Sequence, residues 1–254
     1  MLYGSEGAFT VTLYPNDLQH DLDLLEQIEK ATLRLVVQAL YDFRAGVREV
    51  FTLERQEANT DAVDYIGEDI TREALDRLGT SIIPVRLAGN IDYKKARYVF
   101  QPSFSVAQAL FVDSKVEEIA GAGTATIQTS QTSMAIRQVR AGMVVDQPGG
   151  LPVIIERSDR SLLSTTIFVK YSYQQDPLEL RRVSILCLPN GMLQSRYNPN
   201  ADDTFWLAGR NAPSRGEPFR VRISLPRLKA KAVWRVQHID MTSPVSSVFF
   251  TWDE

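Results

Sequence analysis

The 254-residue sequence contains one cysteine and two histidines, and this scarcity excludes several kinds of site. Cys187 alone forms no internal disulfide framework and supplies too few thiolates for a cysteine-rich zinc site. His20 and His238 are too few for a histidine-based zinc site. Because Cys187 lies in the apolar run "VSILCLPNG", we expect a buried structural thiol in a reducing cytoplasm.

The sequence also lacks the patterns of a membrane-spanning helix, a signal peptide and a nucleotide-binding loop. No apolar run approaches the ~20 residues that a membrane-spanning helix needs. The N-terminus, "MLYGSEGAFTVTLYPND", has no basic segment followed by an apolar one, so we expect no signal peptide. Neither a phosphate-binding G-x-x-x-x-G-K-[ST] loop nor a well-placed G-x-G-x-x-G is present. With 44% apolar and 23% charged residues, the composition is that of an ordinary globular protein.

The net charge of −3 conceals an uneven distribution. Residues 1–76 contain sixteen acidic and six basic side chains, whereas residues 205–235 contain eight basic side chains and one acidic. A local basic segment can bind phosphate even on an acidic protein, although a solvated charged face is the simpler alternative.

Apolar spacing predicts helices in the first third of the chain and strands after it. Three- and four-residue spacing from Leu22 to Leu40 predicts a helix, with Asp17 or Asp21 as its cap. A second helix is expected at about 69–78, after a polar loop and before Gly79, with Glu68 and Asp69 at its N-terminus.

Strand patterns follow Ser81. We expect strands in "SIIPVRLAGNIDY", "KARYVF", "ALFVDSK", "TTIFVKYSY" and "RRVSILCLP", with "QQDPLE" as a hairpin turn. The segment at 120–134 fits a loop, a strand or a DNA-facing segment. "FRVRISL" alternates apolar and basic residues, which predicts a strand with one face of each kind. Together these patterns predict one α/β domain around a central mixed sheet.

Two Asp-x-Lys patterns are the chemical candidates, "IDYK" at 91–94 and "ALFVDSK" at 109–115. On a strand, Asp113 and Lys115 point to the same face. The carboxylate can hold Mg²⁺, while the lysine helps deliver one of its waters to a phosphorus atom. The plain alternative is a strand end that turns toward solvent.

Such a site needs a second carboxylate, and Asp92 is the candidate. An acid about twenty residues before an acid-x-lysine pair, on an adjacent strand, matches the PD-(D/E)xK nuclease arrangement. Asp92 would then be the partner acid, and Lys94 would be incidental or would contact backbone phosphate.

Beyond this pattern, the sequence resembles the SfiI family of type II restriction endonucleases and, more distantly, BglI. The resemblance covers most of residues 24–240 and lies in these segments, in order: "EKATLRLVVQAL", "EDITREAL", "AGNIDYKKARY", "QALFVDSK", "TTIFVKYSY", "RYNPNADDTFW" and "APSRGEPFRVRISL". The segment 120–164 and both termini depart most from the relative.

The resemblance implies a role for each matching residue. Asp92 and Asp113 would be metal-binding acids, and Lys115 would be the catalytic lysine. The backbone carbonyl of Ser114 would be a further metal ligand. Glu68 would hold a second metal or a water, unless it only complements a helix dipole.

Four arginines are implied as DNA contacts. Arg220 and Arg222 match arginines that read bases in the major groove, and arginine is the natural bidentate partner of guanine. Arg210 stands where the relative has lysine, and Arg215 would read a base or contact phosphate.

The implied fold is a PD-(D/E)xK restriction-endonuclease-like domain over residues 1–254. Its parts would be a helical part at about 17–79, a catalytic sheet at about 81–190 and a basic DNA-reading part at about 196–235. The implied activity is Mg²⁺-dependent cleavage of both DNA strands at an interrupted G·C-rich palindrome such as GGCCNNNNNGGCC, giving 5′-phosphates and 3′ overhangs.

A double-strand cut requires at least a two-fold dimer. The resemblance to SfiI implies a homotetramer, the one to BglI permits a dimer, and either implies a cognate DNA methyltransferase in the host. Two alternatives remain, a repair or recombination nuclease on the same fold and a non-cleaving DNA-binding module.

Overall fold

The computed structural model describes residues 13–57, 63–76, 83–86, 95–101, 106–121, 123–208, 220–243 and 251–254. Asp92, Arg210 and Arg215 lie outside these ranges, and Arg220 is described by its backbone alone. The roles predicted for these four residues therefore stay predictions.

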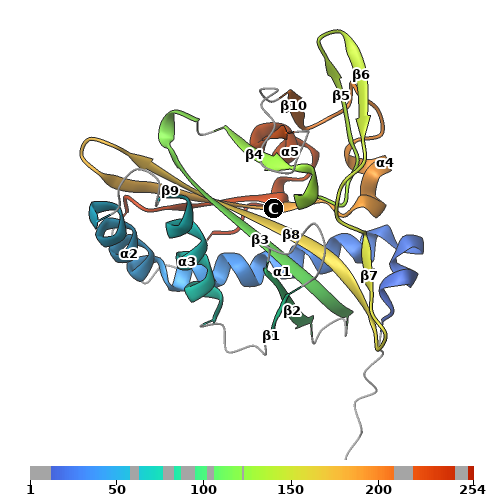
Figure 1. Ribbon diagram of the computed structural model, residues 1–254, viewed down its shortest axis with the longest axis horizontal. Coiled ribbons are helices and arrows are strands. Elements are labelled where there is room, and N and C mark those ends of the chain that lie inside the picture. Colours follow the sequence, from blue (N-terminus) through green and yellow to red (C-terminus); the bar gives the residue numbers. More distant parts are fainter. Residues whose placement is uncertain are drawn as a thin grey trace, which may run out of the picture.

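Helices form the first layer of the molecule (Figure 1). They are η1 (Pro15–His20), α1 (Leu22–Asp42), α2 (Arg44–Glu57) and α3 (Val63–Asp76). The α1 helix buries the apolar positions that its spacing predicts, which are Leu25, Ile28, Leu33, Val36, Val37 and Leu40. Of the two candidate caps, Asp21 is the one used, because its carboxylate accepts a hydrogen bond from the Leu24 amide at 2.9 Å.

Two predictions for this layer are wrong. The segment after α1 is not a polar loop throughout, because residues 44–57 form α2, which buries Val47 and Phe51. The next helix begins at Val63 rather than near Asp69, so Glu68 and Asp69 lie in its second turn and not at its N-terminus. Its predicted end at Gly79 falls outside the described residues.

A mixed sheet forms the centre, as the sequence predicts (Figure 1). Its main path runs in the order β1-β2-β3-β8-β9-β12, and β7 also pairs with β8. The strands are β1 (Ile83–Arg86), β2 (Lys95–Gln101), β3 (Val106–Glu118), β7 (Ile154–Glu156), β8 (Ser161–Gln174), β9 (Glu179–Leu188) and β12 (Val236–Asp240). Among the described pairs in this sheet, β3 and β8 are parallel and the others antiparallel. The meander of the first strands and the β8–β9 hairpin are confirmed.

A second, smaller sheet contains the basic strand. It has the order β10-β11-β4, from β10 (Trp206–Ala208), β11 (Arg220–Ser224) and β4 (Thr124–Gln128). The segment 120–134, for which three alternatives were open, therefore contributes strand β4 as well as the short helices η2 (Ile119–Gly121) and η3 (Thr129–Gln131). Beside β11 lies α5 (Leu225–Lys231).

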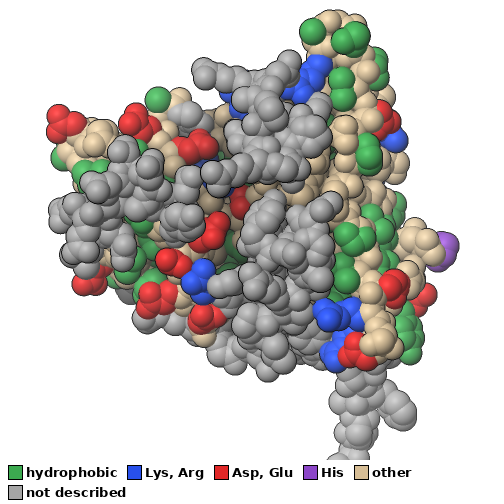
Figure 2. Space-filling view, in the orientation of Figure 1, with side chains coloured by type: hydrophobic (Ala, Val, Ile, Leu, Met, Phe, Trp, Pro, Cys, Tyr) green, Lys and Arg blue, Asp and Glu red, His purple; other side chains and the backbone are tan. Residues whose placement is uncertain are grey.

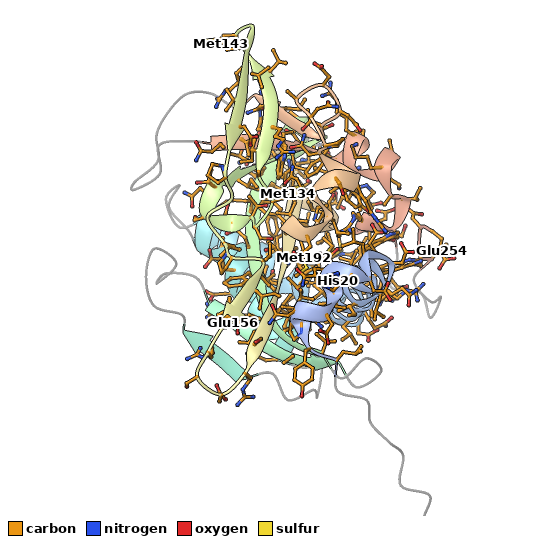
Figure 3. The ribbon with its side chains drawn as sticks, turned by 90° about the vertical axis from the view of Figure 1, so that its right-hand side faces the viewer. His20, Met134, Met143, Glu156, Met192 and Glu254 are labelled. Atoms are coloured by element: carbon orange, nitrogen blue, oxygen red, sulfur yellow. The ribbon has the colours of Figure 1, made fainter. Side chains whose placement is uncertain are left out.

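A hairpin of β5 (Ile136–Arg140) and β6 (Met143–Gln147) extends away from the rest of the chain (Figure 1). Figure 3 shows Met143 at its far end, where Met143 and Val144 are strongly exposed. At the base of this hairpin, the Asn198 side chain accepts from the Arg137 amide at 2.8 Å and donates to the Arg137 carbonyl at 3.0 Å. Asn198 follows α4 (Gln194–Tyr197), so the "RYNP" segment anchors the hairpin.

Two large apolar clusters lie on opposite faces of β8. Ile167, Val169 and Tyr171 pack with the helical layer. Phe168 belongs to the second cluster, which includes Ile127 and Val221 of the smaller sheet. Because strand residues alternate between faces, β8 holds the helices on one side and the smaller sheet on the other. None of the helices in the described part of the chain has the length and apolarity to cross a membrane.

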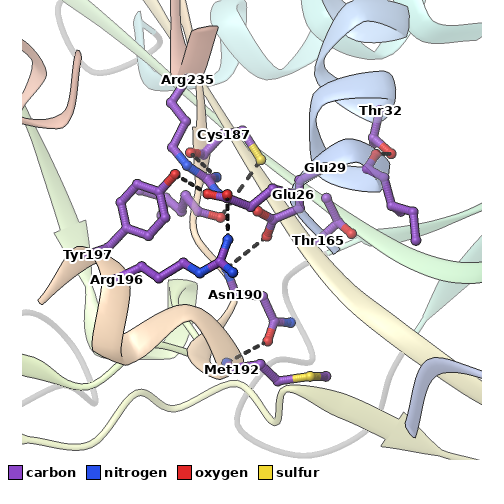
Figure 4. Close-up of polar contacts among 12 residues, drawn as sticks. Glu26, Glu29, Thr32, Thr165, Cys187, Asn190, Met192, Arg196, Tyr197 and Arg235 are labelled. Atoms are coloured by element: carbon purple, nitrogen blue, oxygen red, sulfur yellow. Dashed lines mark hydrogen bonds and ion pairs between the residues drawn. The ribbon is translucent and has the colours of Figure 1, made fainter. Parts of the chain in front are cut away.

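A buried ion pair ties α1 to the C-terminal part of the chain (Figure 4). Glu29 and Arg235 are fully buried, and the guanidinium donates to the carboxylate at 2.7 Å. Glu29 also accepts from the Asn190 amide at 2.8 Å, and Arg235 stacks on the Tyr197 ring at 4.2 Å. Burial raises the pKa of Glu29, while the adjacent Glu29 carboxylate raises the pKa of Arg235 and keeps it charged.

Candidate active site

Strand β3 divides the residues of the acid-x-lysine segment between two faces. Ser114 is buried on the side of α3, where its hydroxyl forms a hydrogen bond with the Thr71 hydroxyl. Asp113 and Lys115 occupy the alternate positions and are both half-buried. Both residues lie within β3, so the prediction that their side chains share one face of a strand is confirmed.

Helix α3 packs closely on this part of the sheet because Gly67 has no side chain. A Cβ atom at Gly67 would stand 3.0 Å from Cγ2 of Val116 and 3.2 Å from Cδ2 of Tyr171. Such distances leave no room for a methyl group without a shift of the neighbours. The close approach brings the next residue, Glu68, to the edge of β3.

Three buried hydroxyl groups fix the helix at this level. Thr71 donates to the Gly67 carbonyl at 2.8 Å, so its oxygen accepts at 2.7 Å from both Ser114 and Tyr171. Burial raises the pKa of Tyr171, which stays a neutral donor. This network sets the position of α3 relative to the strand that carries Asp113 and Lys115.

Glu68 of α3 interacts electrostatically with Asp113 and Lys115. Partial desolvation and the nearby Asp113 carboxylate raise the pKa of Glu68, and the Lys115 ammonium acts in the opposite direction. Two neighbouring carboxylates form a favourable site for a divalent cation with oxygen ligands. Helix-dipole complementation does not account for Glu68, because that effect is confined to the first turn.

Within the ranges that the structure describes, no group of three or more His, Cys, Asp or Glu side chains comes together as a metal site. The predicted partner acid, Asp92, lies outside those ranges, three residues before β2 begins at Lys95. Strand β2 is the neighbour of β3, with Ala96 opposite Phe111.

The surface around this site is acidic. Helix α3 exposes Glu68, Asp69, Glu73 and Asp76, and Asp69 pairs with Arg72 at 2.8 Å. Figure 2 shows acidic side chains over the part of this face where α2 and α3 lie. A phosphate group would approach such a surface favourably only with cations in place.

The basic strand is confirmed in its alternation. Val221 and Ile223 of β11 are fully buried, whereas Arg222 between them is exposed. Strand β11 pairs with β4, and Arg222 lies opposite Thr126. Arg220 begins the strand opposite Gln128. The structure thus places the acid-lysine site and the exposed arginine on two different sheets.

Sequence reasoning missed one charged residue beside the site. Lys170 of β8 is the register partner of Lys115, and its side chain is fully buried. Its ammonium donates to Glu117 and to the Thr124 carbonyl, each at 2.7 Å. The available signal was a lysine in the middle of the otherwise uncharged strand "TTIFVKYSY".

Comparisons with known proteins agree with this architecture. A family model described as "Type II restriction enzyme SfiI" matches residues 41–239. SfiI from Streptomyces fimbriatus is 34% identical over 231 residues, which cover 86% of this chain and 85% of the relative.

Two solved structures share the fold. A crystal structure of tetrameric SfiI bound to cognate DNA matches with a TM-score of 0.77 and 32% identity, covering 93% of this chain and 90% of that one. BglI bound to its DNA recognition sequence matches with a TM-score of 0.72 over 90% of this chain and 95% of that one. At 14% identity, the second likeness concerns the fold alone.

The mixed sheet and its helices therefore have the fold of restriction endonucleases, which confirms the predicted fold class. More particularly, the chain belongs to the SfiI family of type II restriction enzymes, as the sequence segments predict. It is a nuclease of that type.

Proposed function

We propose that this enzyme uses Mg²⁺ to cut both strands of DNA at an interrupted G·C-rich palindrome, GGCCNNNNNGGCC or a close variant. The products would carry 5′-phosphates and 3′ overhangs, which makes the enzyme a type II site-specific deoxyribonuclease. The observation that carries the catalytic part of this proposal is the position of Asp113 and Lys115 two residues apart on β3, with Glu68 of α3 in electrostatic interaction with both.

The metal ligands would be Asp92, Asp113 and the Ser114 backbone carbonyl, with Glu68 as a further ligand. The raised pKa of Glu68 beside Asp113 supports a cation between these carboxylates. Oxygen donors of this kind suit Mg²⁺, which when bound supplies charge stabilisation at the scissile phosphate.

Lys115 would orient the attacking water and offset negative charge on the phosphate. Its position on the face of Asp113 keeps the ammonium within reach of the same phosphate. The attack would be in line, with the 3′ oxygen as the leaving group and a 5′-phosphate as the product.

Sequence would be read by Arg222 and Arg220 of β11, with Arg210 and Arg215 as further DNA contacts. Exposure of Arg222 between two buried residues supports this role, because the side chain must leave the smaller sheet on its solvent face. Bidentate bonds from arginine to guanine O6 and N7 fit a site rich in G·C pairs.

The active assembly would be a homotetramer that binds two DNA sites. Each chain supplies one catalytic site and one half-site contact, so a dimer cuts one duplex. The 32% identical SfiI structure is tetrameric on cognate DNA, which supports the larger assembly. The enzyme would act in the cytoplasm, where a cognate methyltransferase protects host DNA.

Digestion of a sequenced genome by the purified protein tests this proposal. With Mg²⁺, mapping of every end should give one interrupted palindrome, a fixed spacer and 3′ overhangs. With EDTA no cut should appear. Scattered cuts without a shared sequence would instead favour a repair or recombination nuclease, and specific binding without any cut would favour a DNA-binding module.

A further inference from the structure

The buried lysine of β8 lies at the junction of the two sheets. Lys170 has no exposed side-chain surface, and a buried ammonium is costly unless it is paired and hydrogen-bonded. Glu117, which is partly exposed, provides the countercharge at 2.7 Å. Because it is fully buried, Lys170 is out of reach of a DNA phosphate, so its position calls for another explanation.

The pair borders the catalytic strand directly. Lys170 and Lys115 are register partners on the parallel strands β8 and β3. Glu117 follows Lys115 by two positions and therefore points to the same face. Neighbouring strands lie about 4.8 Å apart, so Lys170 lies directly beside the backbone that carries Lys115.

The second contact of Lys170 reaches the smaller sheet. The Thr124 carbonyl, which accepts from Lys170 at 2.7 Å, belongs to the first residue of β4. Thr124 lies opposite Ser224 of β11, and Thr126 lies opposite Arg222. One ammonium group therefore bonds both to the catalytic strand and to the strand beside the DNA-reading arginine.

We propose that Lys170 and Glu117 form a positioning pair that couples base reading by β11 to the placement of Lys115 and Asp113. This inference rests on the proposed function of those residues. When β11 engages its cognate bases, the position of β4 is fixed, and Lys170 carries that position to β3. At a mismatched site the link would hold β3 away from its productive geometry.

The test uses three variants, which are Lys170→Met, Glu117→Gln and the double variant. The control is Lys30→Met, which removes an ion pair between α1 and Glu254. Cognate and single-mismatch duplexes are used in two measurements. Affinity is measured with Ca²⁺ in place of Mg²⁺, and the single-turnover cleavage rate constant is measured with Mg²⁺. Urea denaturation gives the stability of each variant.

We expect the double variant to regain stability relative to Glu117→Gln, because the fully buried Lys170 ammonium is no longer left without its countercharge. Its cognate cleavage should nevertheless stay about 10- to 100-fold below wild type, since a shift of about 1 Å in an active site has effects of this size. Cognate affinity should stay near the wild-type value. The ratio of cognate to mismatched cleavage should fall toward the ratio of the two affinities, whereas Lys30→Met should behave as wild type.

Two results would overturn the inference. If the double variant cleaves at the wild-type rate, the pair serves stability alone. If cleavage falls only in proportion to affinity, Lys170 affects DNA binding rather than coupling. Should Lys170→Met fail to fold, Glu117→Gln and the double variant decide the question. Asp113→Ala separates this inference from the proposed function, since retained cleavage in that variant would contradict the catalytic site itself.

Discussion

Gly67 of α3 lies so close to Val116 of β3 that a Cβ atom would stand 3.0 Å from the valine Cγ2. A methyl group there requires the helix, or the Val116 and Tyr171 side chains, to shift by a few tenths of an ångström. We expect Gly67→Ala to lower the free energy of unfolding by about 1–3 kcal/mol. The cleavage rate should fall by more than the loss of stability accounts for, because a shift of α3 also moves Glu68.

Gly123 provides the control for this substitution, since nothing lies within 4 Å of its Cβ position. Gly123→Ala should leave the unfolding free energy, measured by urea denaturation, close to that of the wild type. Equal stability and activity in both alanine variants would show that the close packing at Gly67 has no part in the site.

Asp113→Ala should abolish cleavage and retain sequence-specific binding in Ca²⁺. The carboxylate is proposed as a metal ligand, while base reading is proposed for β11 of the smaller sheet. Plasmid digestion with Mg²⁺ and a binding assay with Ca²⁺ measure the two properties separately. Unchanged cleavage would contradict the site assignment.

Glu68→Gln should change how stability depends on pH. Partial desolvation and Asp113 raise the pKa of Glu68, so the folded, metal-free protein binds this proton more tightly than the unfolded chain. This tighter proton binding contributes stability below the pKa that Glu68 has in the unfolded chain. The contribution is lost as the pH rises through the pKa that Glu68 has in the folded protein. In EDTA, the variant should therefore melt at a higher temperature than wild type near neutral pH and similarly in acid.

Glu73→Gln, on an exposed position of the same helix, is the matched control. Saturating Mg²⁺ should raise the melting temperature of the wild type and of the Glu73 variant more than that of the Glu68 variant. The same Mg²⁺ response in all three would remove Glu68 from the ligand set.

Arg222→Ala should cost about 1–3 kcal/mol of discrimination between cognate and mismatched sites, because an arginine–guanine pair contributes that amount. Binding titrations at several salt concentrations measure it. Equal weakening on all sequences, with a smaller salt dependence, would instead identify Arg222 as a phosphate contact. Arg227→Ala, an exposed neighbour on α5, serves as the comparison.

Arg235→Met should destabilise the protein by about 3–5 kcal/mol, because the buried Glu29 carboxylate loses its cation. Adding Glu29→Gln to that variant should recover much of the loss. Arg196→Ala, which removes partly exposed pairs with Asp23 and Glu26, should cost less than about 1 kcal/mol. Urea denaturation measures the unfolding free energy of each variant. A double variant that lost the sum of the two single effects would contradict this prediction.

Local patterns made part of this fold predictable. Helix α1 has a continuous apolar stripe, and Asp113 and Lys115 are two apart on one strand, so both features follow from periodicity. Helix α2 has few buried apolar residues among many charges, and Gly67 and Glu68 obscured the start of α3. These helices form because tertiary packing favours them.

Distant contacts could not be predicted from these patterns. The partners of Lys170 lie 46 and 53 residues away, so no local spacing indicates them. The parallel register of β3 and β8 is equally non-local. The candidate residues could therefore be proposed from the sequence, while the contacts that position them could not.

Parallel strands need a long crossover, and the chain between β3 and β8 makes one that contains β4 and the β5–β6 hairpin. A strand of the smaller sheet thus lies in an insertion that begins at the end of β3 and returns to β8. Replacing this crossover would also change the position of the Thr124 carbonyl, which accepts a hydrogen bond from Lys170. The segment from 119 to 160 accordingly joins the sheet that carries Arg222 to the strands that carry Lys115 and Lys170.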